Sequence, residues 1–132
     1  VTKAHLVRAT LEAICYQSRE VLEAMEADAG ISLRALKVDG GAARNDLLMQ
    51  LQADILDTPV IRPTVRETTA LGAAYAAGLA VDFWEDLDTL RQNWQAEREF
   101  EGTWDDARRA EGYAGWKRAV ERAKGWLKEE QG

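Results

Sequence analysis

Residues 38–45 read Val-Asp-Gly-Gly-Ala-Ala-Arg-Asn, and this stretch decides how the chain is expected to fold. Before it, residues 33–38 alternate partly between apolar and polar side chains, which predicts a short strand that ends at the double glycine. After it, Asn45 or Asp46 opens a segment with leucine and isoleucine on one face, which predicts a helix. A strand, a tight turn and a helix in this order are typical of an α/β protein.

The double glycine has two interpretations. Glycine at positions 40 and 41 permits positive φ and removes the Cβ atoms that would keep a ligand away from the backbone. The amide groups at the start of the following helix could then face a nucleotide, and the Asn45 side chain could donate or accept at the edge of a heterocycle. The alternative is a turn whose glycines serve tightness alone, because two glycines after a strand are far less specific than a phosphate-binding loop.

Further segments extend the α/β pattern on the C-terminal side. A second short strand is predicted over 59–63, where two prolines favour an edge position or strand ends. Thr68 or Thr69 is expected to cap a helix over 70–79, whose many alanines predict burial on more than one side. Because short strands joined through helices are expected to be parallel neighbours, we predict a two-stranded parallel sheet, which is too small to be complete.

Amphipathic helices are expected at both ends of the chain. The first begins near Thr2 and ends before Gly30, since glycine commonly follows a helix C-terminus. The charged residues 83–100 predict a peripheral helix, and a final helix is predicted over 105–128. The tryptophans of this half are interpreted as packing anchors rather than as stacking platforms for single-stranded nucleic acid, because acidic residues are as frequent there as basic ones.

The composition is that of a globular protein. The chain has 132 residues, of which 46% are hydrophobic and 30% charged, which excludes collagen and low-complexity classes. The net charge of −6 argues against nucleic acid as a partner, and no run of 18 apolar residues suggests a membrane segment. We expect one domain over 1–132, with an α/β core over 1–84 and a C-terminal helical flank over 85–132.

The location and completeness of the chain are also predicted from its ends and its single cysteine. One cysteine allows no internal disulfide, and no signal peptide precedes the first helix, so the reducing cytoplasm is the expected compartment. The chain begins at Val1 without methionine and enters a helix at once. We therefore expect it to be a piece of a longer protein.

Other polar residues form no complete catalytic constellation. His5, the only histidine, is expected to be exposed, and Cys15 lies on an apolar helix face, which favours a buried structural role. One histidine and one cysteine cannot make a structural zinc site, so we expect no metal ligand set. Arg62, Arg66 and Glu67 could bind an anion before the helix over 70–79, but a capping cluster is favoured.

Several motifs together resemble one family. Residues 39–42 resemble the adenosine-binding motif of the superfamily of sugar kinases, Hsp70 and actin. Residues 70–84, 98–100 and 113–120 resemble the C-terminal domain of the FGGY carbohydrate kinases, and within them the glycerol kinases, over nearly the whole chain. The resemblance implies a partial ribonuclease H-like α/β domain, rich in helices, whose short parallel sheet lacks its first strands.

The resemblance also implies a function. It implies the C-terminal, nucleotide-side part of an enzyme that uses ATP to phosphorylate glycerol to sn-glycerol 3-phosphate. Gly41 would approach ATP or ADP through its backbone, Asn45 would lie at the adenine, and Gly40 and Ala42 would line the same pocket. The family's first phosphate loop, glycerol-binding residues and catalytic aspartate lie upstream of the matched part. We therefore expect no catalytic residue and no ligand of Mg²⁺ here, and no turnover by this chain alone.

Three alternatives stay open. The chain could belong to another FGGY sugar kinase, because the residues that select the substrate lie upstream. It could be a non-catalytic helical module that binds proteins, in which case the double glycine is only a turn. Finally, the exposed edge of an incomplete sheet could drive self-association.

Overall fold

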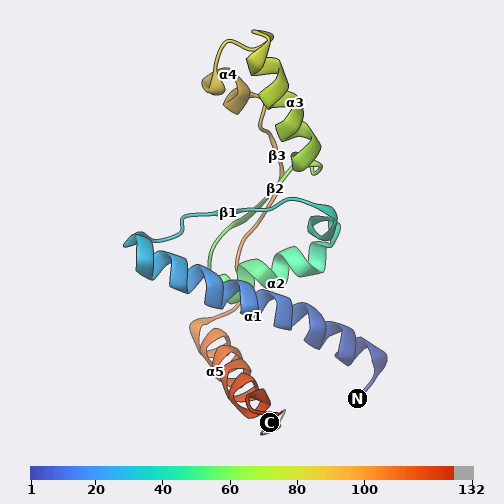
Figure 1. The fold of residues 1–132 in the computed structure, drawn as a ribbon. Helices are drawn as coiled ribbons and strands as arrows, with labels where there is room; N and C mark the ends of the chain where they lie inside the picture. The colour runs from blue at the N-terminus through green and yellow to red at the C-terminus, as the bar shows by residue number, and fades with distance from the viewer. Residues whose placement is uncertain (127–132) are drawn as a thin grey trace, which may run out of the picture.

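The computed structural model describes residues 1–126 (Figure 1). In chain order its elements are α1 (Lys3–Ala29), β1 (Leu36–Lys37), a 3₁₀ helix η1 (Gly41–Arg44), α2 (Asp46–Leu56), β2 (Val60–Pro63), α3 (Thr68–Ala80), α4 (Leu87–Gln92), β3 (Ala96–Phe100) and α5 (Asp106–Ala123). The expected sequence of helix, strand, helix, strand and helix is therefore confirmed up to α3.

The sheet has three strands in the order β1-β2-β3 and is mixed. β1 pairs with β2 in parallel, with Leu36 opposite Val60, whereas β2 pairs with β3 antiparallel, with Val60 opposite Phe100. The predicted two-stranded, all-parallel sheet was wrong in this respect. Of the two alternatives predicted from its prolines, an edge position or strand ends, the second is confirmed: Pro59 lies just before β2 and Pro63 is its last residue, while β2 itself is the central strand.

The third strand occupies a segment that was expected to be helical. Residues 83–100 contain only the short helix α4 before β3 begins. Every side chain of β3 except Phe100 is exposed, so no apolar alternation marks the strand. Its formation depends on the backbone groups of β2, which lie far away in sequence and would otherwise lack partners on that side. The helical flank predicted over 85–132 thus contributes a strand to the sheet, and a domain division at residue 84 stays a prediction.

The core forms where α1 packs against α2, which in turn contacts β2 and β3 (Figure 1). Its largest fully buried side chains are Leu51, Ile55, Val60 and Cys15. From the C-terminal side, Tyr113 and Trp116 of α5 stack on Tyr16 of α1. The buried position of Cys15 and the packing role of Trp104 and Trp116 are therefore confirmed, whereas a packing role for Trp126 was wrong, since its side chain is 86% exposed.

The helix boundaries follow local signals in most places. Gly30 ends α1 in the left-handed conformation with φ of 66°, as predicted. Asp105 caps α5, and its carboxylate accepts a hydrogen bond from the Arg108 backbone N–H at 2.8 Å. The end predicted for this helix, at residue 128, was wrong, because α5 ends at Ala123 and Lys124 is its C-cap residue in extended conformation. None of the helices within residues 1–126 is both long enough and apolar enough to cross a bilayer.

α3 and α4 form one end of the molecule and α5 the other, with the sheet between them (Figure 1). The predicted burial of α3 on more than one side was wrong, because only Gly78 is buried, beneath the ring of Trp84. The alanine side chains of α3 are short, so they contact another element only where the two backbones lie close together. The cap predicted at Thr68 or Thr69 was also wrong, since the N-cap residue is Glu67 and the Thr68 hydroxyl donates to the carboxylate of Asp39.

Candidate functional site

The four predicted nucleotide-binding residues lie together in the turn between β1 and α2. Gly40 has φ of 78° and ψ of 179°, a conformation that is essentially restricted to glycine. Gly41 and Ala42 form the first turn of η1, and Asn45 follows as the N-cap residue of α2. The positive φ predicted for this turn is thus confirmed at Gly40, and Gly41 does not need it.

The backbone of the turn is tied down at both ends but free in the middle. The Gly40 N–H donates to the Arg66 carbonyl at 3.0 Å, and the Asn45 N–H donates to the Ala42 carbonyl at 3.1 Å. Between them, the hydrogen bonds found in residues 1–126 leave the N–H groups of Gly41 and Ala42 without an acceptor. Both residues are exposed. Two adjacent backbone donors therefore face open space at a fixed position.

The two glycines differ in what a side chain would meet. A Cβ atom at Gly41 would have no heavy atom within 4 Å, and φ at Gly41 is ordinary. A Cβ atom at Gly40 would also meet open space, but the backbone conformation there excludes it. Gly40 is therefore required by the turn itself, whereas the fold alone does not require glycine at position 41.

Gly40→Ala is expected to lower the free energy of unfolding by about 1–3 kcal/mol, because alanine must adopt a conformation that only glycine adopts readily. Urea denaturation followed by circular dichroism measures this. The matched control is Gly41→Ala, which is expected to change the same free energy by less than about 0.5 kcal/mol. Equal stability of Gly40→Ala and the parent chain would contradict the strained turn.

Asn45 uses one side of its amide to cap α2. Its Oδ1 atom accepts a hydrogen bond from the Leu48 N–H at 3.1 Å. This bond uses one of the two lone pairs of the carbonyl oxygen, and the hydrogen bonds found in residues 1–126 leave the side-chain NH₂ group free to donate. Donation or acceptance at a heterocycle therefore both stay predictions.

A buried arginine lies beneath the turn. Arg62 of β2 is only 5% exposed, and its Nη1 atom donates to the Ala43 carbonyl at 2.9 Å and to Asp46 at 2.7 Å. Its Nε atom donates to Glu97 of β3 at 3.1 Å. The hydrogen bond from Arg62 holds the pKa of Asp46 below its ordinary value, so this carboxylate is charged at neutral pH.

Glu97 is shared between two arginines. Arg66 donates to Glu97 at 2.6 Å, and this bond is the main reason why the pKa of Glu97 is lowered. The predicted capping cluster was wrong for Arg62 and Arg66, which pair with Asp46 and Glu97 instead. Glu67 does occupy the N-cap position of α3, but its side chain makes no capping hydrogen bond. These ion pairs could not be predicted from the sequence, because the acidic partners, Asp46 and Glu97, belong to α2 and β3.

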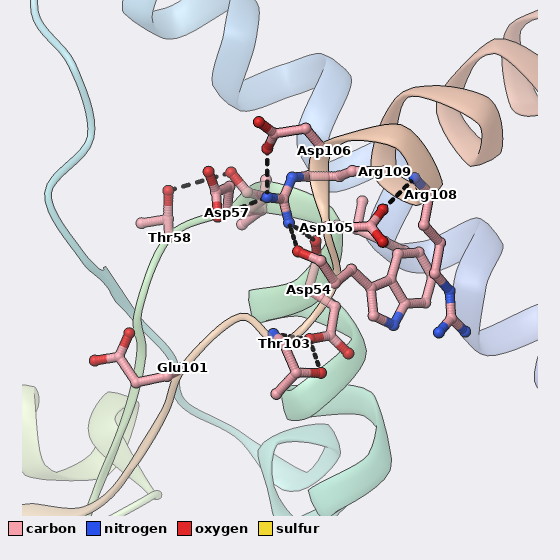
Figure 2. A network of polar contacts seen from close by, with 12 residues as sticks. Asp54, Asp57, Thr58, Glu101, Thr103, Asp105, Asp106, Arg108 and Arg109 are labelled. Carbon is pink, nitrogen blue, oxygen red and sulfur yellow. Dashed lines mark hydrogen bonds and ion pairs between the residues drawn. The ribbon is translucent and has the colours of Figure 1, made fainter.

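A second buried arginine holds the other end of α2 (Figure 2). Arg109 of α5 is 9% exposed and donates through Nη1 to the carbonyl oxygens of Asp54 and Trp104, at 3.1 and 2.8 Å. Its Nη2 atom lies 3.0 Å from the carboxylates of both Asp57 and Asp106. The two ends of α2 are thus fastened by arginines of the same kind, and only one of them lies next to the turn.

Two further sequence predictions are settled by position. His5 is exposed and its Nδ1 atom accepts a hydrogen bond from the Thr2 N–H at 3.0 Å, so it helps to cap α1. Cys15 is fully buried and burial raises the pKa of its thiol to about 12, which rules out a nucleophilic role at neutral pH. Neither residue lies in the turn.

The turn is an open surface rather than a cavity. A cavity of about 170 Å³ lies between α3 and α4, lined by Leu71, Tyr75, Leu90 and Trp94 among others, and it includes none of the four turn residues. A ligand bound at the turn would therefore be covered by this chain on one side only.

Comparison with known proteins gives the wider context. Residues 1–81 match the C-terminal domain of the FGGY family of carbohydrate kinases. Glycerol kinases of Mycolicibacterium vanbaalenii and Mycobacterium tuberculosis are each 62% identical over 126 residues, which is 96% of this chain. The chain spans about a quarter of the length of these relatives: 25% of the first and 24% of the second.

Solved structures agree with the expected fold. The crystal structure of Plasmodium falciparum glycerol kinase with ADP superposes with a TM-score of 0.80 at 37% identity, over 93% of this chain and 25% of that one. A xylulose kinase from Lactobacillus acidophilus has the same fold, with a TM-score of 0.72 at 20% identity, over 92% of this chain and 26% of that one. The predicted ribonuclease H-like α/β class is confirmed, with a mixed in place of a parallel sheet. With its match over residues 1–81, the chain belongs to the FGGY family of carbohydrate kinases, as part of their C-terminal domain.

Proposed function

We propose that this chain is the C-terminal, ATP- or ADP-binding part of a glycerol kinase, which transfers a phosphoryl group from ATP to glycerol. The identity of 62% to two mycobacterial glycerol kinases supports this assignment. The TM-score of 0.80 to a glycerol kinase solved with ADP supports nucleotide binding. Glycerol itself would be bound by the part of the relatives that this chain does not match.

The observation that carries the proposal is the open turn. The N–H groups of Gly41 and Ala42 have no acceptor within residues 1–126, and Gly41 has no Cβ that would keep a ligand away from the backbone. A nucleotide can thus come close to the backbone at Gly41 and accept from these donors. The Oδ1 atom of Asn45 accepts a hydrogen bond from the Leu48 N–H, and the NH₂ group of the same side chain would donate to a ring nitrogen of adenine.

We assign the phosphoryl-transfer chemistry to the part of the glycerol kinases that this chain does not match. Within residues 1–126 no three aspartate, glutamate, histidine or cysteine side chains are grouped as a metal site, and we assign no ligand of Mg²⁺ to this part. A metal would reach this turn with the nucleotide phosphates. Phosphoryl transfer needs both substrates positioned in line. We therefore propose that the chain alone binds nucleotide and does not turn over glycerol.

Two other functions receive less support. Kinases for xylulose or gluconate are only 19–24% identical to this chain, against 62% for the glycerol kinases. A protein-interaction module would agree with the exposed apolar residues of α1, such as Val7 and Met25. That function predicts no nucleotide affinity at the turn, and the same experiment distinguishes it.

The proposal is tested by calorimetric titration of the chain with MgADP. We expect saturable binding that Gly41→Ala weakens at least tenfold, about 1.4 kcal/mol, because the new methyl group occupies the space where the nucleotide meets the backbone. Since Gly41→Ala is expected to leave the fold intact, a loss of affinity would report on the ligand alone. GDP should bind far more weakly than ADP if Asn45 reads the adenine ring.

Two results would contradict the proposal. The first is the absence of heat on titration with millimolar MgADP while circular dichroism shows a folded chain. The second is equal affinity of the parent chain and Gly41→Ala, which would place the nucleotide elsewhere and leave the double glycine as a structural turn.

A further inference from the structure

Among residues 1–126, Arg62 is the buried cation that joins the turn to the rest of the fold. Its guanidinium bonds to three acceptors on three different elements: the Ala43 carbonyl of η1, Asp46 of α2 and Glu97 of β3. The side chain is 6% exposed and lies 5.2 Å from the centre of the Phe100 ring. A nucleotide on the outer side of the turn would thus lie opposite Arg62, with η1 between them.

The Ala43 carbonyl explains why this arginine matters for the turn. Ala43 is 2% exposed, so its carbonyl oxygen has little access to water and depends on Arg62 for its partner. η1 is a single 3₁₀ turn with few hydrogen bonds of its own. The orientation of the Gly41 and Ala42 N–H groups, which belong to the same turn, is therefore fixed from below by Arg62.

We propose that Arg62 is a positioning residue of the nucleotide site: through the Ala43 carbonyl and Asp46 it holds η1 and the start of α2 in the orientation that presents the Gly41 and Ala42 N–H groups to an adenine nucleotide. This inference rests on the proposed function. Arg62 touches no nucleotide and acts only through these two contacts. Binding is favoured because the donors are already oriented before the ligand arrives.

Lysine is the informative substitution because it keeps the charge and most of the length. Arginine presents several N–H donors in a rigid planar fork, whereas lysine has a single ammonium group. Arg62→Lys can therefore pair with one carboxylate but cannot at once hold the Ala43 carbonyl, Asp46 and Glu97. The variant should make the turn less rigid, while a positively charged side chain still fills the position of Arg62.

Arg109 supplies a matched control at the opposite end of α2 (Figure 2). Like Arg62 it is buried, it donates to backbone carbonyls, and it pairs with two carboxylates, Asp57 and Asp106. Arg109→Lys makes the same chemical change and should lower stability to a similar degree. It touches no atom of the turn, so nucleotide affinity should be unchanged.

The experiment measures the dissociation constant of MgADP for the 132-residue chain, Arg62→Lys and Arg109→Lys, with urea denaturation to show that each is folded. We expect Arg62→Lys to weaken ADP about tenfold, and Arg109→Lys to bind within about twofold of the parent. Amide hydrogen exchange without ligand should become faster at Ala43 and Asn45 in Arg62→Lys only. A purely structural role would lower stability in both variants and leave the affinity of the folded fraction unchanged.

If Arg62→Lys does not fold, Asp46→Asn replaces it, because Asp46 is exposed and the substitution removes the negative charge from one of the two contacts of Arg62 on the turn side. We expect it to weaken ADP about threefold, with Asp106→Asn as the unaffected control. Affinity within twofold of the parent in a folded Arg62→Lys would overturn the inference and leave the proposed function standing. No binding by the parent chain would overturn the proposed function, and the inference with it.

Discussion

Ile55→Ala is expected to lower the free energy of unfolding by about 2–5 kcal/mol, because it removes three buried carbons and leaves a cavity that its neighbours fill only in part. Ile55 is 0% exposed on α2. α2 contacts α1, β2, β3 and α5, so a loss of packing there affects every layer of the core. This loss is a large share of the total stability of an ordinary domain, about 5–15 kcal/mol.

Urea or thermal denaturation measures the free energy of unfolding of Ile55→Ala and of Leu47→Ala, a matched truncation on the same helix. Leu47 is 46% exposed, so its truncation removes little buried area and should cost less than about 1 kcal/mol. Similar losses for the two variants would mean that α2 does not pack through Ile55. A destabilised α2 should also weaken nucleotide binding, because Asn45 at its start belongs to the turn.

Cys15 is expected to react with iodoacetamide at least about 100-fold more slowly in the folded chain than in urea at pH 8. Burial, reinforced by the nearby charge of Glu12, raises the pKa of the thiol from 9.0 to about 12. At pH 8 this lowers the thiolate fraction about 10³-fold, and the greater nucleophilicity of a more basic thiolate recovers only part of that loss. The side chain is also 0% exposed, so reagent must wait for an opening of α1 from α2.

Mass spectrometry of the alkylated chain over time gives both rates. Because the raised pKa disfavours the thiolate, the rate in the folded chain should still be rising at pH 10, where the rate in urea has levelled off. Equal rates with and without urea at pH 8 would mean that Cys15 is accessible and that the contact between α1 and α2 does not form.

The elements with strong local signals could be predicted from the sequence. α1 and α2 have apolar side chains at helical spacing, and each has one recognisable boundary: α1 ends at Gly30 and α2 begins at Asn45. The turn at Gly40 was predictable for the same reason, since a glycine directly after a strand and before a helix is a local feature. The turn was therefore located correctly along the chain, while its assignment as a binding site stays a prediction.

The features that were missed depend on partners far away in sequence. β3 exists because β2 offers it backbone hydrogen bonds, and its residues Ala96–Phe100 show no apolar alternation. The role of Arg62 depends on Asp46 and Glu97, which lie 16 and 35 residues away. Neither pairing leaves a periodic mark in the sequence, so only the folded structure shows them.

The binding of adenine nucleotide at the Gly40–Asn45 turn is tested most directly by amide chemical shifts. A ¹⁵N–¹H spectrum of the chain titrated with MgADP should show its largest saturable changes at Gly41 and Ala42 and in the side-chain NH₂ group of Asn45, since these donors face the ligand. Resonances of the cavity between α3 and α4, such as the Trp94 indole N–H, should stay in place. Changes centred on that cavity, or none at all in a folded chain, would contradict the account.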